Sequence, residues 1–123
     1  MQRPSVVIAN SDVTRSSLLA KGLREFSHNV VTARNLEELE HAVAKHRAEI
    51  VIADLETVSL RDVEQLRDEF DNLNVVCTHR VPDEQMWTAS LTVGATDCCS
   101  SNDVDDVVRA AFHRPYKVRT QAA

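Results

Sequence analysis

Short hydrophobic runs recur along the chain, and each one is followed by a segment whose hydrophobic residues have helical spacing. The runs cover residues 5–9 (SVVIA), 29–33 (NVVTA), 49–53 (EIVIA), 74–78 (NVVCT) and 96–100 (TDCCS). They are continuous rather than alternating, which is typical of strands buried on both faces of a parallel sheet. The pattern therefore predicts five strand–helix units.

Helices are predicted after each of these strands. They cover residues 12–26, 35–46, 59–70, 82–94 and 103–114. In the second helix, Leu36, Leu39 and Val43 form one hydrophobic stripe, while the acidic residues between them face water. Asn35 suits the start of this helix, and Gly94 suits a left-handed stop after the fourth. Because parallel strands need right-handed crossovers, we expect an α/β domain with helices on both faces of the sheet.

Composition and charge exclude several classes of function. With 123 residues, of which 43% are hydrophobic, the chain fits a single domain with one core. The formal net charge of −5 provides no basic surface, so we expect no nucleic-acid binding by this domain. No hydrophobic run approaches the ~20 residues that cross a bilayer, and residues 1–12 lack the apolar core of a signal peptide. We therefore expect a cytoplasmic protein without a membrane partner.

The three cysteines lie inside the strand-like runs, and we expect them to be free thiols. They are Cys77, Cys98 and Cys99. An odd number of cysteines in a chain of this size does not indicate a disulfide framework. Cys98 and Cys99 should point to opposite faces of their strand, which favours packing over redox chemistry.

Polar residues stand where the predicted strands end. Asn10 follows the first strand, Asp54 follows the third, Thr78 ends the fourth and Ser101 follows the fifth. The carboxyl ends of parallel strands meet at one edge of an open sheet, where ligands bind in such folds. We therefore expect a polar crevice at this edge, with Asp54 as its central functional residue rather than as a simple strand terminator.

The order and spacing of these residues resemble the receiver domain of response regulators in bacterial two-component systems. The resemblance rests on Asp54, Thr78 and the sequence GATD at 94–97, and it spans about residues 5–113. It implies a flavodoxin-like (βα)5 fold with five parallel strands in the order 2-1-3-4-5. It also implies that Asp54 is the phosphoacceptor position for a histidine kinase and that Thr78 is the switch hydroxyl.

The resemblance also divides the chain. The receiver-like domain is expected to cover residues 1–113, and residues 114–123 form either a C-terminal tail or the start of a linker.

Two departures from the family pattern concern the charges around Asp54. The family's acidic pair, which holds Mg²⁺, falls on Ala9 and Asn10, and its lysine falls on Ser101. Mg²⁺ demands hard oxygen ligands in octahedral geometry and loses its water reluctantly. We therefore expect Mg²⁺ binding to be weak or lost, and we expect no other cofactor or metal.

Two further carboxylates lie near Asp54 in the sequence. Asp12 is expected to cap the first helix rather than to bind metal, whereas Glu56 is close enough to supply a replacement oxygen. Since the Mg²⁺ and lysine charges are missing, the pKa of Asp54 is expected to lie above its ordinary value.

These features predict an atypical receiver, or pseudo-receiver, that is not an enzyme. It would act as a protein-interaction module in two-component-type signal transduction, with phosphorylation impaired or absent. One alternative is a conventional phosphorelay receiver that a histidine kinase phosphorylates on Asp54. Another is a small flavodoxin-like cofactor-binding protein, suggested by Thr14, Ser16 and Ser17, although no glycine for a phosphate loop lies between residues 5 and 21.

The expected partners are a signalling protein or a histidine kinase. Trp87, with Leu91 in the predicted fourth helix, lies at the boundary of core and surface. A partly exposed tryptophan is a common interface anchor, and receivers often assemble through their fourth and fifth helices. A homodimer through residues 82–94 and 103–114 is therefore one candidate assembly, and packing of Trp87 against its own sheet is the alternative.

Overall fold

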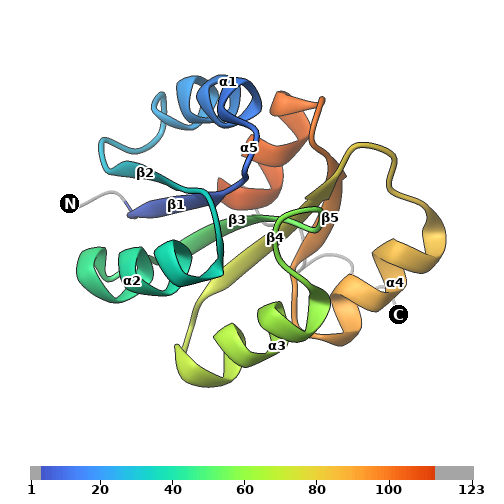
Figure 1. Ribbon diagram of the computed structural model, residues 1–123. Helices are drawn as coiled ribbons and strands as arrows, with labels where there is room; N and C mark the ends of the chain where they lie inside the picture. Colours follow the sequence, from blue (N-terminus) through green and yellow to red (C-terminus); the bar gives the residue numbers. More distant parts are fainter. Residues whose placement is uncertain (1–3, 113–123) are drawn as a thin grey trace.

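Five parallel strands form one sheet in the order β2-β1-β3-β4-β5 (Figure 1), which confirms the predicted strand order and fold class. The computed structural model describes residues 4–112. The strands are β1 (Val6–Ala9), β2 (Val30–Ala33), β3 (Ile50–Asp54), β4 (Asn74–His79) and β5 (Asp97–Ser100). Each predicted strand is confirmed to within one residue at either end. Asp54 is the last residue of β3 rather than the first residue after it.

Helices cover both faces of this sheet, as predicted. They are α1 (Val13–Leu23), α2 (Leu36–His46), α3 (Leu60–Glu69), α4 (Glu84–Thr92) and α5 (Val104–Phe112). Figure 1 shows α1 and α5 on one face and α2, α3 and α4 on the other. The first helix is shorter than predicted because the chain turns after Leu23, whose carbonyl accepts hydrogen bonds from Phe26 and Ser27. Residues 113–123, which include the predicted tail, lie outside the described residues.

Successive strand residues enter two different hydrophobic clusters. Val7 and Val51 pack with the helices α2 and α3, whereas Ile8 and Ile52 pack with α1 and α5. All four side chains are at most 1% exposed. Full burial of such a side chain stabilises the fold by about 1.5–3 kcal/mol. The need to fill both clusters explains why these strands read as continuous hydrophobic runs.

The three cysteines are free and buried, as predicted. Cys98 belongs to the cluster under α2 and α3, and Cys99 belongs to the cluster under α1 and α5. Burial raises the pKa of Cys77 to about 12 and also raises the pKa of Cys99. The thiols therefore stay protonated and act as small packing groups.

Polar side chains fix where the helices begin. The Asp12 carboxylate accepts from the Arg15 amide at α1, and Ser59 forms a capping box at α3. At α4 the cap is Asp83, whose side chain accepts from the Met86 amide. After α4, Gly94 has a φ of 103°, so the predicted left-handed stop is confirmed.

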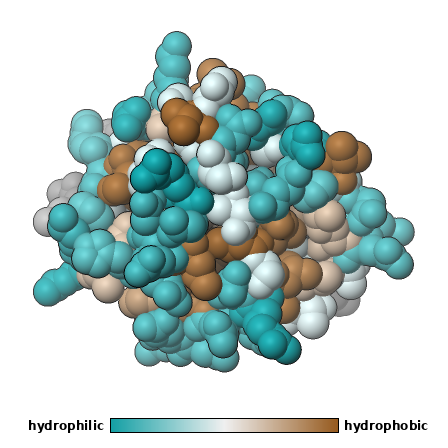
Figure 2. Space-filling view, in the orientation of Figure 1, coloured by the Kyte–Doolittle hydropathy of each residue, from teal (hydrophilic) through white to brown (hydrophobic). Residues whose placement is uncertain are grey.

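The surface is mostly hydrophilic at the periphery of the face shown in Figure 2, and hydrophobic residues gather toward its centre. Within residues 4–112 no helix combines the length and the hydrophobicity needed to cross a bilayer. Among the described residues, the large hydrophobic side chains that remain exposed are Val13, Leu18, Phe26, Val81 and Trp87.

The close approach of α1 and α5 at Gly22 leads to a stability prediction. A Cβ atom at Gly22 would lie 2.5 Å from Cγ1 of Val104, so Gly22→Ala should destabilise the fold by about 1–3 kcal/mol. In a Val104→Ala background the same substitution should stabilise by roughly 0.5–1 kcal/mol, since alanine is the better helix former. Urea unfolding of the four proteins measures both effects, and equal effects in the two backgrounds would contradict the steric explanation.

Candidate functional site

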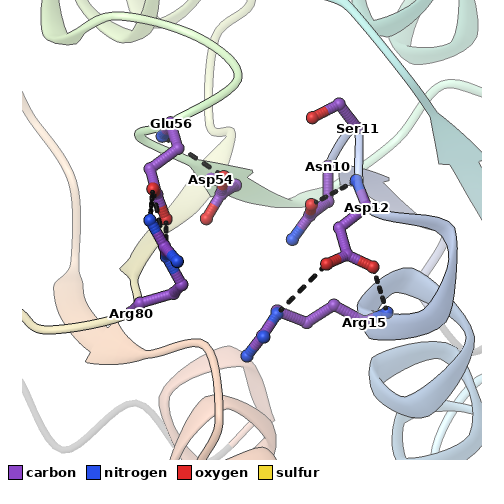
Figure 3. Close-up of a pocket in the computed structure, with 7 residues that line it drawn as sticks. All are labelled: Asn10, Ser11, Asp12, Arg15, Asp54, Glu56 and Arg80. Atoms are coloured by element: carbon purple, nitrogen blue, oxygen red, sulfur yellow. Dashed lines mark hydrogen bonds and ion pairs between the residues drawn. The ribbon is translucent and has the colours of Figure 1, made fainter.

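A polar pocket of about 220 Å³ lies at the carboxyl edge of the sheet, where the sequence predicted a crevice. Side chains from the β1–α1 loop, α1, the end of β3 and the loops after β3 and β4 line it (Figure 3). The lining residues are Asn10, Ser11, Asp12, Arg15, Asp54, Glu56 and Arg80.

Asp54 is buried at the end of β3, and its carboxylate accepts three hydrogen bonds. The register of β3 and β4 places Thr78 directly beside it, and Thr78 Oγ1 donates to Asp54 Oδ1 at 3.1 Å. The Glu56 amide and Thr57 Oγ1 each donate to Asp54 Oδ2 at 3.2 Å. The two side chains are therefore in direct contact at the carboxyl edge of the sheet, although Thr78 is fully buried and does not itself line the pocket.

Burial raises the pKa of the Asp54 carboxyl above its ordinary value of 3.8, in the direction predicted. The side chain loses water, which penalises its charged form. Hydrogen bonds from Thr78 and Thr57 oppose this shift, and the nearby Glu56 charge adds to it. Among the groups present, loss of water is the largest cause of the raised pKa of Asp54.

The first loop differs from the sequence prediction by one position. Ala9 is fully buried inside β1, paired with Ala33 and Ala53, and it does not line the pocket. The residues that face the pocket are Asn10 and Ser11, together with Asp12. Ala9 is therefore not a pocket position, because β1 ends at Ala9 and the loop that reaches the pocket begins at Asn10.

Asp12 has two roles where the sequence predicted one. Its Oδ1 accepts from the Arg15 amide at 3.1 Å as the helix cap, and its Oδ2 lies 3.9 Å from Arg15 Nε. The Asn10 side chain holds this turn, because Asn10 Oδ1 accepts from the Asp12 amide at 2.9 Å. The cap is therefore also a charged wall of the pocket.

Arg15 brings a cation to the β5–α5 loop, a contact that the sequence analysis missed. Its Nη1 donates to Asn102 Oδ1 and lies 3.5 Å from Ser101 Oγ. Ser101, predicted as a crevice residue, is buried beside Arg15 in an adjoining hollow and does not line the Asp54 pocket. The one signal in the sequence was the spacing of three residues between Asp12 and Arg15 at the start of the predicted helix, which allows the two side chains to pair.

Glu56 and Arg80 form a second ion pair over the pocket. Arg80 Nε donates to Glu56 Oε1 at 3.0 Å and Arg80 Nη2 donates to Oε2 at 2.8 Å. These hydrogen bonds lower the pKa of Glu56. Figure 3 shows this pair and the Asp12–Arg15 pair on either side of Asp54. The sequence analysis did not identify Arg80 as a pocket residue. The available signal was its position two residues after Thr78, because side chains two residues apart in a strand point to the same face.

The donor set does not fit a divalent metal. Glu56, which was considered as a replacement ligand, is engaged by Arg80, and Asp12 is engaged by Arg15. Asn10 Oδ1 accepts from the Asp12 amide, and both Asp54 oxygens accept from protein donors. Across the described part of the chain, no three carboxylate, histidine or cysteine side chains are arranged to hold a metal ion.

Trp87 lies on α4 with 41% of its surface exposed. Its Nε1 donates to Asp97 Oδ1 on β5 at 3.0 Å. The polar edge of the ring is therefore held by its own sheet while part of the ring faces solvent, and a role in an interface stays a prediction.

Comparison by structure shows that the chain shares its fold with response regulators. It is similar to a response regulator from Thermotoga maritima, with a TM-score of 0.78 and 20% identity over 87% of this chain and 92% of that chain. It is also similar to a response regulator protein from Burkholderia pseudomallei with a phosphorylated aspartic acid, calcium ion and citrate, with a TM-score of 0.81 and 16% identity over 98% and 73% of the respective chains. An orphan response regulator of H. pylori gives a TM-score of 0.75 and 15% identity over 85% and 90%. No family model and no curated protein matches the sequence.

The chain therefore has the receiver fold of two-component response regulators, as the sequence predicted. Because the identities are 20% or lower, the similarity establishes the fold. The chemistry of the crevice follows from its own residues.

The raised pKa of Asp54 predicts how stability depends on pH. The folded protein holds this proton more tightly than the unfolded chain, so the contribution of Asp54 falls as pH rises above 3.8 toward the folded pKa. The free energy of unfolding of Asp54→Asn should therefore rise relative to that of wild type as pH increases over this range. Any difference between the two proteins at low pH, where Asp54 is protonated, is constant and does not affect this trend. Urea titrations from about pH 3.5 to 7 measure the difference.

A variant with the opposite sign serves as the control for this measurement. Hydrogen bonds from Arg34 lower the pKa of Glu38, so Glu38→Gln should lose stability relative to wild type as pH rises. A carbon-detected NMR titration of Asp54 that gave a midpoint below 3.8 would contradict the prediction.

Proposed function

We propose that this domain is a receiver-like interaction module of two-component-type signalling, in which phosphorylation of Asp54 is impaired or absent. On this proposal the domain binds its partner without waiting for a phosphoryl group. The receiver fold supports the signalling class, and the residues around Asp54 support the departure from conventional chemistry.

The observation that carries the proposal is the identity of the first-loop residues that line the pocket. They are Asn10, Ser11 and Asp12, and the one carboxylate among them is paired with Arg15. Phosphoryl transfer depends on positioning and on neutralisation of the phosphoryl charge. An amide and a hydroxyl attract Mg²⁺ weakly, and the cations Arg15 and Arg80 are already paired with carboxylates. Metal binding and neutralisation of the phosphoryl charge, through which a receiver promotes its own phosphorylation, are therefore both weakened on this proposal.

The contact of Thr78 supports a preformed working conformation. In a receiver this hydroxyl is the one that would engage the phosphoryl oxygens. Here it donates to the unmodified Asp54 carboxylate at 3.1 Å. A hydroxyl that the carboxylate already satisfies gains less from phosphorylation, so the switch has a smaller driving force.

On this proposal the partner contacts α4, and Trp87 is part of the contact surface. Only Ser90 is buried within this helix, so most of its surface stays available to a signalling protein or a second copy of the chain. The hydrogen bond to Asp97 restricts the Trp87 ring before binding, which lowers the entropic cost of an interface.

A conventional phosphorelay receiver is the second candidate. It is favoured by the place of Asp54 at the end of β3, beside Thr78, with the Asp12 carboxylate lining the same pocket. The similar protein from Burkholderia pseudomallei carries a phosphorylated aspartic acid.

Titration with Mg²⁺ and beryllofluoride, a phosphoryl mimic, separates the two candidates. Wild type should show no saturable shifts of the Asp54 and Thr78 amides in NMR spectra at millimolar Mg²⁺. Asn10→Asp with Ser11→Asp should gain Mg²⁺-dependent shifts, because carboxylates replace the neutral groups that line the pocket. Gln65→Glu with Gln85→Glu adds the same charge at exposed helix positions and should gain none. Saturable shifts in wild type would establish the conventional receiver instead.

Truncation of Trp87 tests the partner surface. Trp87→Ala should weaken self-association or partner binding by about 1 kcal/mol or more, since a central aromatic anchor is lost. Trp87→Phe should retain part of the affinity, and Leu18→Ala, at another exposed hydrophobic residue on α1, should change nothing. Sedimentation and calorimetry measure these affinities. A wild-type protein that stays monomeric and a partner affinity unchanged by Trp87→Ala would together exclude this surface.

A further inference from the structure

The hydroxyl of Thr57 connects Asp54 to the first loop. Thr57 Oγ1 accepts a hydrogen bond from the Ser11 amide at 3.0 Å and donates to Asp54 Oδ2 at 3.2 Å. A threonine hydroxyl has one proton and two lone pairs, so it can make both bonds at once. Ser11 Oγ lies 3.4 Å from Thr57 Oγ1. One side-chain atom therefore joins two segments that are 46 residues apart.

Thr57 is itself held in place by the turn after β3. Its amide and that of Val58 donate to the Asp54 carbonyl, both at 2.9 Å. Asp54 is only 5% exposed, so a hydrogen bond to its carboxylate competes little with water. The hydroxyl is thus aimed from a fixed backbone at a buried acceptor, which distinguishes it from a mobile surface contact.

Arg15 makes a second connection, on the other side of the first loop. Its Nε lies 3.9 Å from Asp12 Oδ2, and its Nη1 reaches Asn102 in the β5–α5 loop. Only 25% of the Arg15 side chain is exposed. The start of α1 is therefore connected to the loop in which the receiver family has its lysine.

We propose that Thr57 is a positioning residue that bridges Asp54 to the first loop in place of a divalent metal, and that Arg15 connects α1 to the β5–α5 loop in place of the lysine. The protein's own groups then hold the crevice in one conformation, with Thr78 engaged on Asp54. The two bridges would leave the domain ready to bind without phosphorylation. This consequence for signalling rests on the proposed function.

The Ser11 amide reports on the Thr57 bridge. In wild type without Mg²⁺ its hydrogen exchange should be slower than that of an unstructured chain, because the amide donates to Thr57. Thr57→Val keeps the shape of the side chain but removes the hydroxyl, and should speed this exchange by roughly fivefold to tenfold. Thr57→Ser keeps the hydroxyl and should restore protection to near the wild-type value. A purely structural role of the side chain would not separate valine from serine in this way.

Arg15 is tested by a reciprocal measurement. Arg15→Met keeps the aliphatic stem but removes the guanidinium, and should shift the Asn102 side-chain amide signals while the Ser11 exchange rate stays within about twofold of wild type. Thr57→Val should do the opposite. Changes at both reporters in both variants would overturn the assignment of two separate bridges.

The outcomes distinguish this inference from the proposed function. An unprotected Ser11 amide in wild type, or equal exchange in Thr57→Val and Thr57→Ser, overturns the bridge whatever the metal titration shows. Because the wild-type measurement needs no variant, the test survives if Thr57→Val fails to fold. Saturable Mg²⁺ and beryllofluoride binding by wild type overturns the proposed function even if Ser11 is protected.

Discussion

The crevice depends on one constraint, the burial of the Asp54 carboxylate at the end of β3. A charged group that loses its water must find donors in the protein, or its charged form becomes costly. Thr78 satisfies one oxygen from β4, and the Glu56 amide and the Thr57 hydroxyl satisfy the other from the turn that follows. The hydrogen bonds that stabilise the carboxylate therefore also fix the strand end, the turn and the neighbouring strand relative to one another.

The charges around Asp54 follow a different principle from that of a metal-dependent site. A divalent ion concentrates positive charge at one point and draws loops together through oxygen ligands. Here the positive charge is divided between Arg15 and Arg80, and each guanidinium is directed toward a carboxylate of its own, Asp12 or Glu56. These ion pairs are partly exposed, so their contribution to stability is small.

The sheet and its helices provide a rigid support for this edge, whereas α4 is held less firmly. The central strands β1 and β3 are buried between two clusters of hydrophobic side chains, and β1 has no exposed surface. In α4 only Ser90 is buried, and the Trp87 hydrogen bond to Asp97 supplies a second anchor to β5. Elements with little buried surface open at low free-energy cost, so α4 is expected to open more readily than the central strands.

The sequence by itself determined the five strand–helix units, because strands buried on both faces need continuous hydrophobic runs and the helices carry their own caps. It also determined that Asp54 and Thr78 meet, since parallel strand ends share one edge of the sheet. Only the tertiary structure decided which residues of the first loop face the pocket. A shift of one residue in the end of β1 decides whether Ala9 or Ser11 lines the pocket, and the structure has Ser11 there. The contacts of Thr57 with Ser11 and of Arg15 with Asn102 join segments 46 and 87 residues apart. These contacts depend on the paths of the loops and on the directions of the side chains, which are set by the packing of the helices. Local sequence patterns do not predict the loop paths or the side-chain directions.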